Sequence, residues 1–381
     1  MKILIVSTYY PFPPSVGGVE TIVRNVSIEL AKRGHEAHIA CSPLDVTAQK
    51  PVTSLGDEKR EGVIVHKLEP SGFKVGYARI LKRLKDTIME IKPDIVHAHN
   101  LHPHIFQLVR WKKRFRYKLV AELHYPAVNL DFAIQKITLW PTMKMLKLVS
   151  NNIDIHIAHS RLEKTWLESH GIESSKIAVL PMQHISSALL NYKSPNTRNR
   201  FRVLFLSRVV PKKGVHILIK AFHNVTLRIP EAELVIVGSE DTKYKRMLLN
   251  LVEELALDKI VRFVNPVSEE EKFKLMISAR IFCLPTLADY HPIVLLEAQA
   301  LGTPLVSTKV GVIPDIVLDG ETGILVRPNN PHELAEAIVK LIEDEELWKR
   351  LSTKARKWAQ NFMLEKRVDE LENLYHRILG K

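Results

Sequence analysis

The feature that most constrains the fold is a regular alternation of short apolar runs with segments of helical periodicity. KILIVS, at residues 2–7, has the composition of a buried strand. The loop PFPPSVGGVE follows, and apolar residues then recur at helical spacing from Val19 to Leu30 until Gly34 ends the helix. Strands that alternate with helices in this way indicate a parallel sheet covered on both faces.

The same alternation continues through the N-terminal half of the chain. The expected elements are the strand EAHIACS, a helix over 77–91, the strands DIVHAH and KLVAELH, helical segments around 130–150, and the strand IDIHIAHS. Residues 186–200, SSALLNYKSPNTRNR, interrupt the pattern with polar residues and a proline, which is typical of a linker.

After this linker the alternation restarts. The expected elements are RVLFLS, helix 214–228, AELVIVG, helix 243–256, IVRFV, helix 269–279, IFCLP, helix 292–301, TPLVS, and amphipathic helices over 331–344, 345–361 and 364–378. The chain therefore predicts two Rossmann-like, doubly wound α/β domains, over 1–190 and 200–361, that face a central cleft. Ligands of open α/β sheets bind at the carboxyl ends of the strands, so we expect the site at this cleft.

The charge balance narrows the class of partner. The 381 residues include 55 Lys and Arg against 42 Asp and Glu, which gives a net charge of +13 with neutral histidines. Such a balance favours an anionic partner: nucleic acid, a phosphorylated small molecule or the headgroups of a membrane.

Cysteine usage and hydropathy bear on the compartment. Cys41 and Cys283 lie in apolar runs, which predicts buried thiols and a reducing environment. The apolar run at the start is shorter than the core of a signal peptide, and no apolar segment reaches the length of a membrane span. We expect a soluble, cytoplasmic protein, with a peripheral position on the inner face of the membrane as the alternative.

The window LADYHPIVLLEAQALGTPLV, residues 287–306, contains two acids, Asp289 and Glu297, in an apolar segment. Pro292 can begin a helix and Gly302 can end it. If all intervening residues were helical, the acids would lie about 12 Å apart along the axis. Retaining glycosidases place their carboxyls about 5–5.5 Å apart, which disfavours a hydrolase. The spacing suits two hydroxyl groups of one polyhydroxylated ligand; the alternative is a loop acid and a solvent-facing helix residue.

A basic turn follows the first strand of the C-terminal half. In LSRVVPKKGVHILIKAF, residues 206–222, Arg208 comes just after the strand, and Lys212 and Lys213 precede the next helix. Cations at the carboxyl end of a strand can clamp a diphosphate from two sides. A solvated turn between strand and helix is the alternative.

These residues resemble the motifs of glycosyltransferase family 4. The acidic window is similar to the family's E-x7-E motif, with Asp289 in place of the first Glu and Glu297 as the second. SRVVPKKG resembles its Arg…Lys-Gly turn, YPFPPSVGGVE at 10–20 its glycine loop, and LAKRGHEAHI at 30–39 its first helix and second strand. VGVIPDIVLDGETGILVRPNNPHELAEAI, at 310–338, continues the match, so the resemblance extends over nearly the whole chain in family order.

The resemblance implies a GT-B fold whose last helix, 364–378, crosses back, so that residues 362–381 complete the N-terminal domain. It implies a retaining hexosyltransferase that takes a sugar from a nucleotide-sugar donor held by the C-terminal domain. The leading interpretation adds an acceptor, either a sugar or a lipid-linked molecule, bound by the N-terminal domain, and the resemblance implies no cofactor and no obligate metal.

The resemblance also implies roles for individual residues. Arg208 and Lys213 would neutralise the donor diphosphate, and Glu297 would bind the ribose hydroxyls. Asp289 would hold the donor sugar, and His124, which ends KLVAELH, would orient that sugar and stabilise charge near its anomeric carbon. The donor would also be held by the glycine loop and by the backbone before the helix, at Gly17, Gly18, Tyr290, His291, Pro292 and Ile293.

Two other clusters suggest different chemistry. HAHNLHPH carries four histidines that could suit a metal, His97, His99, His102 and His104. No acid or cysteine nearby in the sequence completes a site, so we expect no metal centre there. The two adjacent glycines at 17–18 do not form a G-x-G-x-x-G fingerprint, which makes a dinucleotide-dependent oxidoreductase a weak alternative.

A basic, aromatic run, RWKKRFRYK, occupies residues 110–118. No recognised nucleic-acid module surrounds it, so we expect no nucleic-acid partner. Together with a helix over 78–92 and TLWPTMKMLKLV at 138–149, it could instead face an anionic membrane and serve a lipid-linked acceptor. A solvated basic face is the alternative.

Two other functions are compatible with the same architecture. One is a UDP-sugar 2-epimerase, which would lack the combination of the Arg…Lys-Gly turn and the E-x7-E motif. The other is a relative that binds a sugar nucleotide without turnover. The sequence assigns no oligomeric state.

Overall fold

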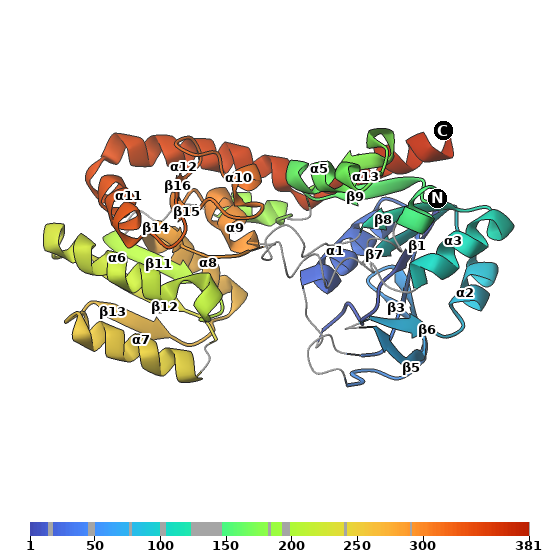
Figure 1. Ribbon diagram of the computed structural model, residues 1–381, viewed down its shortest axis with the longest axis horizontal. Coiled ribbons are helices and arrows are strands. Elements are labelled where there is room, and N and C mark those ends of the chain that lie inside the picture. Colours follow the sequence, from blue (N-terminus) through green and yellow to red (C-terminus); the bar gives the residue numbers. More distant parts are fainter. Residues whose placement is uncertain are drawn as a thin grey trace. The chain divides into compact units, whose positions relative to one another are not determined.

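The computed structural model describes residues 1–13, 18–44, 50–75, 78–99, 104–122, 147–181, 184–192, 199–239, 242–289 and 292–380 (Figure 1). The chain divides into two compact units. Unit 1 comprises Met1–Met182 together with Leu364–Lys381, and unit 2 comprises Gln183–Met363. Each unit is built around its own largely parallel sheet, so the expected pair of Rossmann-like α/β domains is confirmed.

The main sheet of unit 1 has eight strands, in the order β10-β9-β8-β7-β1-β2-β4-β3. Neighbouring strands are parallel except at one edge, where β3 pairs antiparallel with β4. A separate antiparallel pair joins β5 and β6. The strands of unit 1 are β1 (Lys2–Val6), β2 (Glu36–Cys41), β3 (Gly56–Arg60), β4 (Val63–Lys67), β5 (Pro70–Val75), β6 (Ala78–Leu81), β7 (Ile95–His99), β8 (Lys118–Glu122), β9 (Ile155–Ala158) and β10 (Ile177–Val179).

Helices cover both faces of this sheet. Leu4 and Val6 of β1 enter one hydrophobic cluster, whereas Ile3 and Ile5 enter another, because successive side chains of a strand point to opposite faces. The first cluster includes residues of α2, α3 and α5, and the second includes residues of α1 and α13. Among the described residues, the helices of unit 1 include α1 (Gly18–Lys32), α2 (Leu84–Ile91), α3 (His104–Phe115), α5 (Arg161–Ser169), η2 (Ser174–Lys176) and α13 (Leu364–Leu379).

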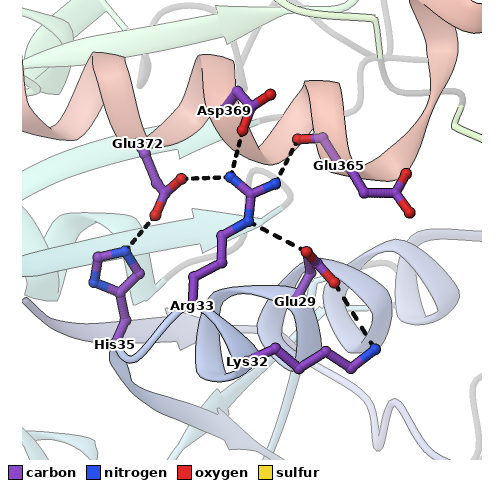
Figure 2. Close-up of polar contacts among 7 residues, drawn as sticks. All are labelled: Glu29, Lys32, Arg33, His35, Glu365, Asp369 and Glu372. Atoms are coloured by element: carbon purple, nitrogen blue, oxygen red, sulfur yellow. Dashed lines mark hydrogen bonds and ion pairs between the residues drawn. The ribbon is translucent and has the colours of Figure 1, made fainter.

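The last helix, α13, is held against α1 by a network of ion pairs (Figure 2). Arg33, just after α1, donates hydrogen bonds to Asp369 at 2.5 Å, to Glu372 at 2.6 Å and to the backbone carbonyl of Glu365 at 2.9 Å. His35 is hydrogen-bonded to Glu372 at 2.6 Å. Apolar residues of α13 are buried in the same cluster as α1: Val368, Leu371, Leu374 and Tyr375. The expected return of the last helix to the N-terminal domain is confirmed.

Unit 2 contains a six-stranded sheet, in the order β13-β12-β11-β14-β15-β16, and every neighbouring pair is parallel. Its strands are β11 (Asn199–Leu206), β12 (Glu233–Val237), β13 (Val261–Val264), β14 (Ala279–Leu284), β15 (Leu305–Thr308) and β16 (Ile324–Val326). Its helices are η3 (Ser187–Asn191), η4 (Pro211–Lys213), α6 (Val215–Arg228), α7 (Thr242–Glu254), α8 (Glu269–Ser278), α9 (Ile293–Ala300), α10 (Ile313–Ile316), α11 (Pro331–Glu343), α12 (Glu345–Ala359) and η5 (Gln360–Phe362). β14 is buried along its whole length and β11 is buried at Val203, Leu204 and Phe205, so the buried parts of these two central strands are largely apolar.

The prediction of one helix over 77–91 is wrong. Residues 78–81 form β6, which pairs antiparallel with β5, and α2 begins only at Leu84. Helical periodicity is a local signal, and here hydrogen bonding to a neighbouring strand overrides it. The helical segments predicted around 130–150 lie outside the described residues, except for the last part of that range.

The stretch predicted as a linker, 186–200, packs into unit 2. Leu189 of η3 and the preceding Ile185 are buried in the core of that unit, and the Ile185 amide donates to the carbonyl of Phe362 at 2.8 Å. The boundary between the units therefore falls before 183 and not at 190–200. Residues 193–198 are outside the described part of the chain.

The prediction of two buried thiols agrees with the structure. Cys41 and Cys283 are free thiols, and burial raises the pKa of both. Among the described residues, none of the helices is both long enough and apolar enough to cross a bilayer.

Candidate functional site

In unit 2, the chain leaves the carboxyl end of β11 through the basic turn η4. Gly214 follows this turn with φ of 75°, and a Cβ at this position would clash with the carbonyl oxygen of Pro285. Only glycine combines this backbone conformation with so close an approach. The carbonyl of Lys212 accepts hydrogen bonds from Thr286 Oγ1 at 3.0 Å and from the Leu287 amide at 2.7 Å. The basic turn is thus fixed against the loop that follows β14.

Lys213 and Asp289 meet beside this turn. The Lys213 ammonium donates a short hydrogen bond to Oδ2 of Asp289, which lies in the loop between β14 and α9. Lys213 is 8% exposed and Asp289 is 7% exposed. An unpaired charge is costly at such a depth, so each side chain needs the other. The structure therefore brings one member of the predicted basic pair into contact with the first acid of the predicted motif.

Glu297, the second acid, is on the buried helix α9 and is 8% exposed. Its Oε1 accepts a hydrogen bond from Lys272 of α8 at 2.7 Å. Its Oε2 is buried and has no hydrogen-bond partner among the described residues. Burial raises the pKa of Glu297, and the nearby charge of Lys272 offsets part of this rise. The alternative interpretation of Glu297 as a solvent-facing helix residue is wrong.

The structure describes some of the other residues of the predicted donor site but not all of them. Arg208 is exposed just beyond β11, Pro292 is the N-cap of α9, and Ile293 is its first residue. Tyr290 and His291 lie outside the described residues. Arg208, Lys213 and Asp289 therefore lie just beyond the carboxyl ends of β11 and β14, where a parallel α/β sheet binds its ligands, and Glu297 lies on the helix that follows β14.

In unit 1, a second group of ionisable side chains lies at the carboxyl ends of β7, β8 and β9. Glu122, the last residue of β8, accepts two hydrogen bonds from Arg367 of α13, at 2.8 and 2.9 Å. His97 of β7 lies 3.3 Å from the same carboxylate and is hydrogen-bonded to Tyr375 at 2.8 Å. Burial would raise the pKa of Glu122, but the charge of Arg367 lowers it well below its usual value. Burial also lowers the pKa of His99 to about 3, which keeps this ring neutral.

The expectation that no acid lies near the histidines of HAHNLHPH is wrong. His99 of β7 is in register with Glu122 of β8, and possible ligand atoms of His97, His99 and Glu122 all lie within 4.8 Å of one another. Both oxygens of Glu122 already accept hydrogen bonds from Arg367, so a dication placed there would be repelled by a buried guanidinium. His104 is buried at the start of α3, and His102 lies outside the described residues.

The remaining predicted residues of unit 1 lie at the limits of the described chain. Gly18 is the first residue of α1, whereas Gly17 and His124 lie outside the described residues. Ser7 and Thr8, at the carboxyl end of β1, are fully buried, and their hydroxyls have no hydrogen-bond partner within the described part of the chain.

Three residues of these sites were missed from the sequence: Lys272, Glu122 and Arg367. For Glu122 a signal existed, because a carboxylate ends the otherwise apolar strand KLVAE. Arg367 and Lys272 lie on helices with many charges, and nothing in the local pattern separates them from solvated neighbours.

Two family models match this chain. The model described as "Glycosyltransferase Family 4" matches residues 16–182, and the model described as "Glycosyl transferases group 1" matches residues 191–358. The chain belongs to glycosyltransferase family 4. These matches favour a glycosyltransferase over the epimerase alternative.

This glycosyltransferase is 25% identical to N-acetyl-alpha-D-glucosaminyl L-malate synthase of Bacillus anthracis, over 100% of this chain and 98% of that protein. It is 33% identical to D-inositol 3-phosphate glycosyltransferase of Corynebacterium glutamicum, but this match spans only 46% of this chain and 43% of that protein. Among solved structures, Anabaena HepE in complex with UDP has a TM-score of 0.75 at 20% identity, over 98% of this chain and 99% of that one. The last similarity concerns the fold.

Proposed function

We propose that this glycosyltransferase moves a hexose from a nucleotide-sugar donor to an acceptor with retention of anomeric configuration. The observation that carries this proposal is Glu297, a buried carboxylate with one oxygen bound to Lys272 and the other without a partner among the described residues. A carboxylate oxygen in this state can accept hydrogen bonds from the vicinal hydroxyls of a ribose. Family membership supports sugar transfer, and the UDP complex of HepE, which has a similar fold, supports a nucleotide-linked donor.

The remaining residues of unit 2 suit the rest of the donor. We assign Arg208 and Lys213 to the diphosphate. Cations that interact more strongly with the phosphate as negative charge develops on it speed cleavage of the sugar–phosphate bond. Asp289 and the backbone of 290–293 would hold the sugar. In unit 1, we assign the loop at Gly17–Gly18 to the diphosphate and His124 to the orientation of the sugar.

The proposed reaction needs no nucleophile from the protein and no obligate metal. The bond between the anomeric carbon and the leaving phosphate oxygen breaks, and the acceptor oxygen forms its bond on the same face of the sugar. The acceptor proton passes to the leaving phosphate, so that a nucleoside diphosphate is released. Arg208 and Lys213 would stabilise the charge that develops on this phosphate.

The test is a panel of UDP-, GDP- and ADP-sugars. A donor that binds raises the melting temperature by mass action, which selects candidates for assays of transfer and hydrolysis. NMR of the product then reports the anomeric configuration. Thermal stabilisation without hydrolysis or transfer to any acceptor would favour a binding protein, and an inverted product would contradict the retaining mechanism.

For the acceptor, we propose a lipid-linked molecule at the inner face of the cytoplasmic membrane. The support is α3, where Arg110, Lys113 and Arg114 are exposed, followed by exposed Arg116. Each Lys or Arg near an anionic bilayer contributes about 1 kcal/mol, so several together can hold a protein there reversibly. Lys112 of the same helix is not assigned to this surface, because it pairs with Asp154 at 2.6 Å.

A further inference from the structure

The contact between Lys272 and Glu297 joins two neighbouring helices of unit 2. Ser268 caps α8 through a capping box with Glu271, which fixes the first turn of the helix. Lys272 follows directly, and its ammonium lies 2.7 Å from Glu297 Oε1 and 4.5 Å from the centre of the Phe273 ring. Its side chain is only 18% exposed, so it lies mostly within the protein with its charge directed at Glu297.

The buried position of Glu297 creates a chemical problem for the role proposed above. Removing a carboxylate from water favours its protonated form, and burial raises the pKa of Glu297 accordingly. A protonated carboxyl group is a donor at one oxygen and loses the charge that strengthens its hydrogen bonds. To accept hydrogen bonds from two ribose hydroxyls, Glu297 has to remain ionised.

We propose that Lys272 is a positioning residue that keeps Glu297 ionised and fixes its Oε1, so that Oε2 is left to accept the ribose hydroxyls of the donor. This inference rests on the proposed ribose-binding role of Glu297. Lys272 touches neither the sugar nor the phosphate in this scheme and acts through Glu297 alone.

The surroundings of Glu297 provide no other described cation for this task. Glu269, also on α8, is an acid and opposes ionisation of Glu297. Of the elements packed on α9, η3 and β15 contain no charged residue. Several cations on the other elements are engaged elsewhere: Arg280 of β14 pairs with Glu345, Arg356 of α12 donates to the carbonyl of Leu190, Lys354 pairs with Glu321, Lys349 pairs with Glu346, and Lys274 of α8 pairs with Glu270. α12 also carries Arg350 and Lys357, but among the described residues Lys272 is the cation whose charge acts on Glu297.

A purely structural role for Lys272 is a weaker explanation. α8 is anchored by three buried apolar residues, Phe273, Met276 and Ile277, and by its capping box. α9 is buried along most of its length by residues such as Leu295 and Leu296. The helices therefore have apolar contacts that do not depend on the lysine, and a change at 272 should act mainly on the charge of Glu297.

The experiment measures the ionisation of Glu297 directly. Glutamate labelled with ¹³C at the side-chain carboxyl reports each titration by NMR, and Glu297→Gln identifies the signal of Glu297. We expect Lys272→Met to raise the pKa of Glu297 by about one to three units, the range for an opposite charge within a few ångströms. Lys272→Arg should restore most of the wild-type value. The matched control is Lys274→Met on the same helix, which should leave Glu297 unchanged.

Calorimetry with UDP, GDP and ADP then connects ionisation to binding. Because Lys272→Met raises the pKa of Glu297, affinity should be lost as pH falls through the raised pKa and should recover at higher pH. We expect at least a tenfold loss for the bound nucleotide below that pKa, with little loss well above it. Glu297→Gln should bind weakly at every pH, without this dependence.

Three results would each overturn part of the scheme. An unchanged pKa of Glu297 in Lys272→Met overturns the role of Lys272, whatever the nucleotide affinities are. A raised pKa together with unaltered nucleotide affinity in Glu297→Gln overturns the proposed ribose contact and retains only the electrostatic coupling. Loss of UDP affinity in Lys272→Met that is equal at all pH values, and is not rescued by Lys272→Arg, indicates a structural effect and also overturns the inference.

Discussion

Arg367 and Glu122 form an ion pair between residues that are 245 positions apart, and both side chains are buried. Nη2 of Arg367 donates to both carboxylate oxygens, at 2.8 and 2.9 Å. Removing one partner from such a pair leaves the other charge buried and uncompensated. The contact attaches α13 to the end of β8, two residues before the predicted catalytic His124.

We expect Arg367→Met to destabilise unit 1 by about 3–5 kcal/mol, because Glu122 would lose its buried counter-charge. The matched control is Arg228→Met, which breaks an exposed ion pair with Glu336 and should cost about 0–1 kcal/mol. Hydrogen exchange of β8 and α13 measures the first effect, and hydrogen exchange of α6, which contains Arg228, measures the second. The double variant Glu122→Leu, Arg367→Met should recover much of the loss, and equal protection in Arg367→Met and Arg228→Met would contradict this account.

The donor clamp can be tested at the basic turn. Arg208→Ala should slow transfer by about a hundredfold or more with little loss of stability, because Arg208 is exposed and is expected to act on the leaving phosphate. Lys213→Ala should slow transfer similarly but also reduce stability, since it removes the buried cation that pairs with Asp289. Lys212→Ala, at an exposed position of the same turn, is the control. Near-normal turnover in both Arg208→Ala and Lys213→Ala would exclude a diphosphate clamp here.

The two acids should divide the donor between them. Glu297→Gln should weaken binding of the bare nucleoside diphosphate, because the ribose is present in it. Asp289→Asn should spare the nucleoside diphosphate and weaken only the intact donor, because its partner is the sugar. Calorimetry of both variants with both ligands distinguishes these roles, and equal losses in all four measurements would refute the division.

Gly214 offers a test of the turn itself. Gly214→Ala places a methyl group against the carbonyl of Pro285 at positive φ, so it should reduce both stability and transfer. Gly320→Ala is a matched control, because Gly320 has a φ of 73° and nothing within 4 Å of the added Cβ. The control should cost about 1–2 kcal/mol from the left-handed backbone alone. Comparable unfolding free energies for the two variants would show that the approach to Pro285 is not what requires glycine.

The membrane proposal has its own measurement. Sedimentation with anionic vesicles should recover the protein with the lipid at low salt, and recovery should fall as salt screens the charges. Replacing Arg110, Lys113 and Arg114 by Ser should abolish most of this binding. Replacing Arg228, Lys349 and Lys354 by Ser removes the same charge from unit 2 and should not. Equal recovery in the supernatant with and without anionic lipid would end the proposal.

The parts of this fold that follow from the sequence are those with strong local signals. The buried part of β11, together with β14 and α9, was predicted because a buried parallel strand or helix is largely apolar in sequence. The helix over 77–91 failed because pairing of β6 with β5 depends on a partner strand that periodicity does not encode. The apolar window with two acids and the basic turn pointed to Lys213, Asp289 and Glu297, the family resemblance added their roles, and the structure brings the first two into contact.

The contacts that tune these groups could not be predicted for a different reason. Lys272 and Glu297 are 25 positions apart, and Glu122 and Arg367 are much further apart. Each pair depends on how separate elements pack, and a charged residue on an amphipathic helix gives no local sign that its partner is buried. Sequence patterns identified Glu297 as an acid of the donor site but did not identify Lys272, the cation that pairs with it.

The position of α13 has a consequence for how the protein is made. During translation, the sheet of unit 1 leaves the ribosome first, but the helix that covers part of one face is synthesised only after all of unit 2. Until then Ile3 and Ile5 of β1, and Ile22 and Val26 of α1, lack the α13 side chains that complete their hydrophobic cluster. Unit 2 is contiguous in the chain and can complete its own fold as it emerges. The domain that is synthesised first is therefore the domain that finishes folding last, and a nascent chain stalled before Leu364 would expose an incomplete N-terminal half to chaperones and proteases.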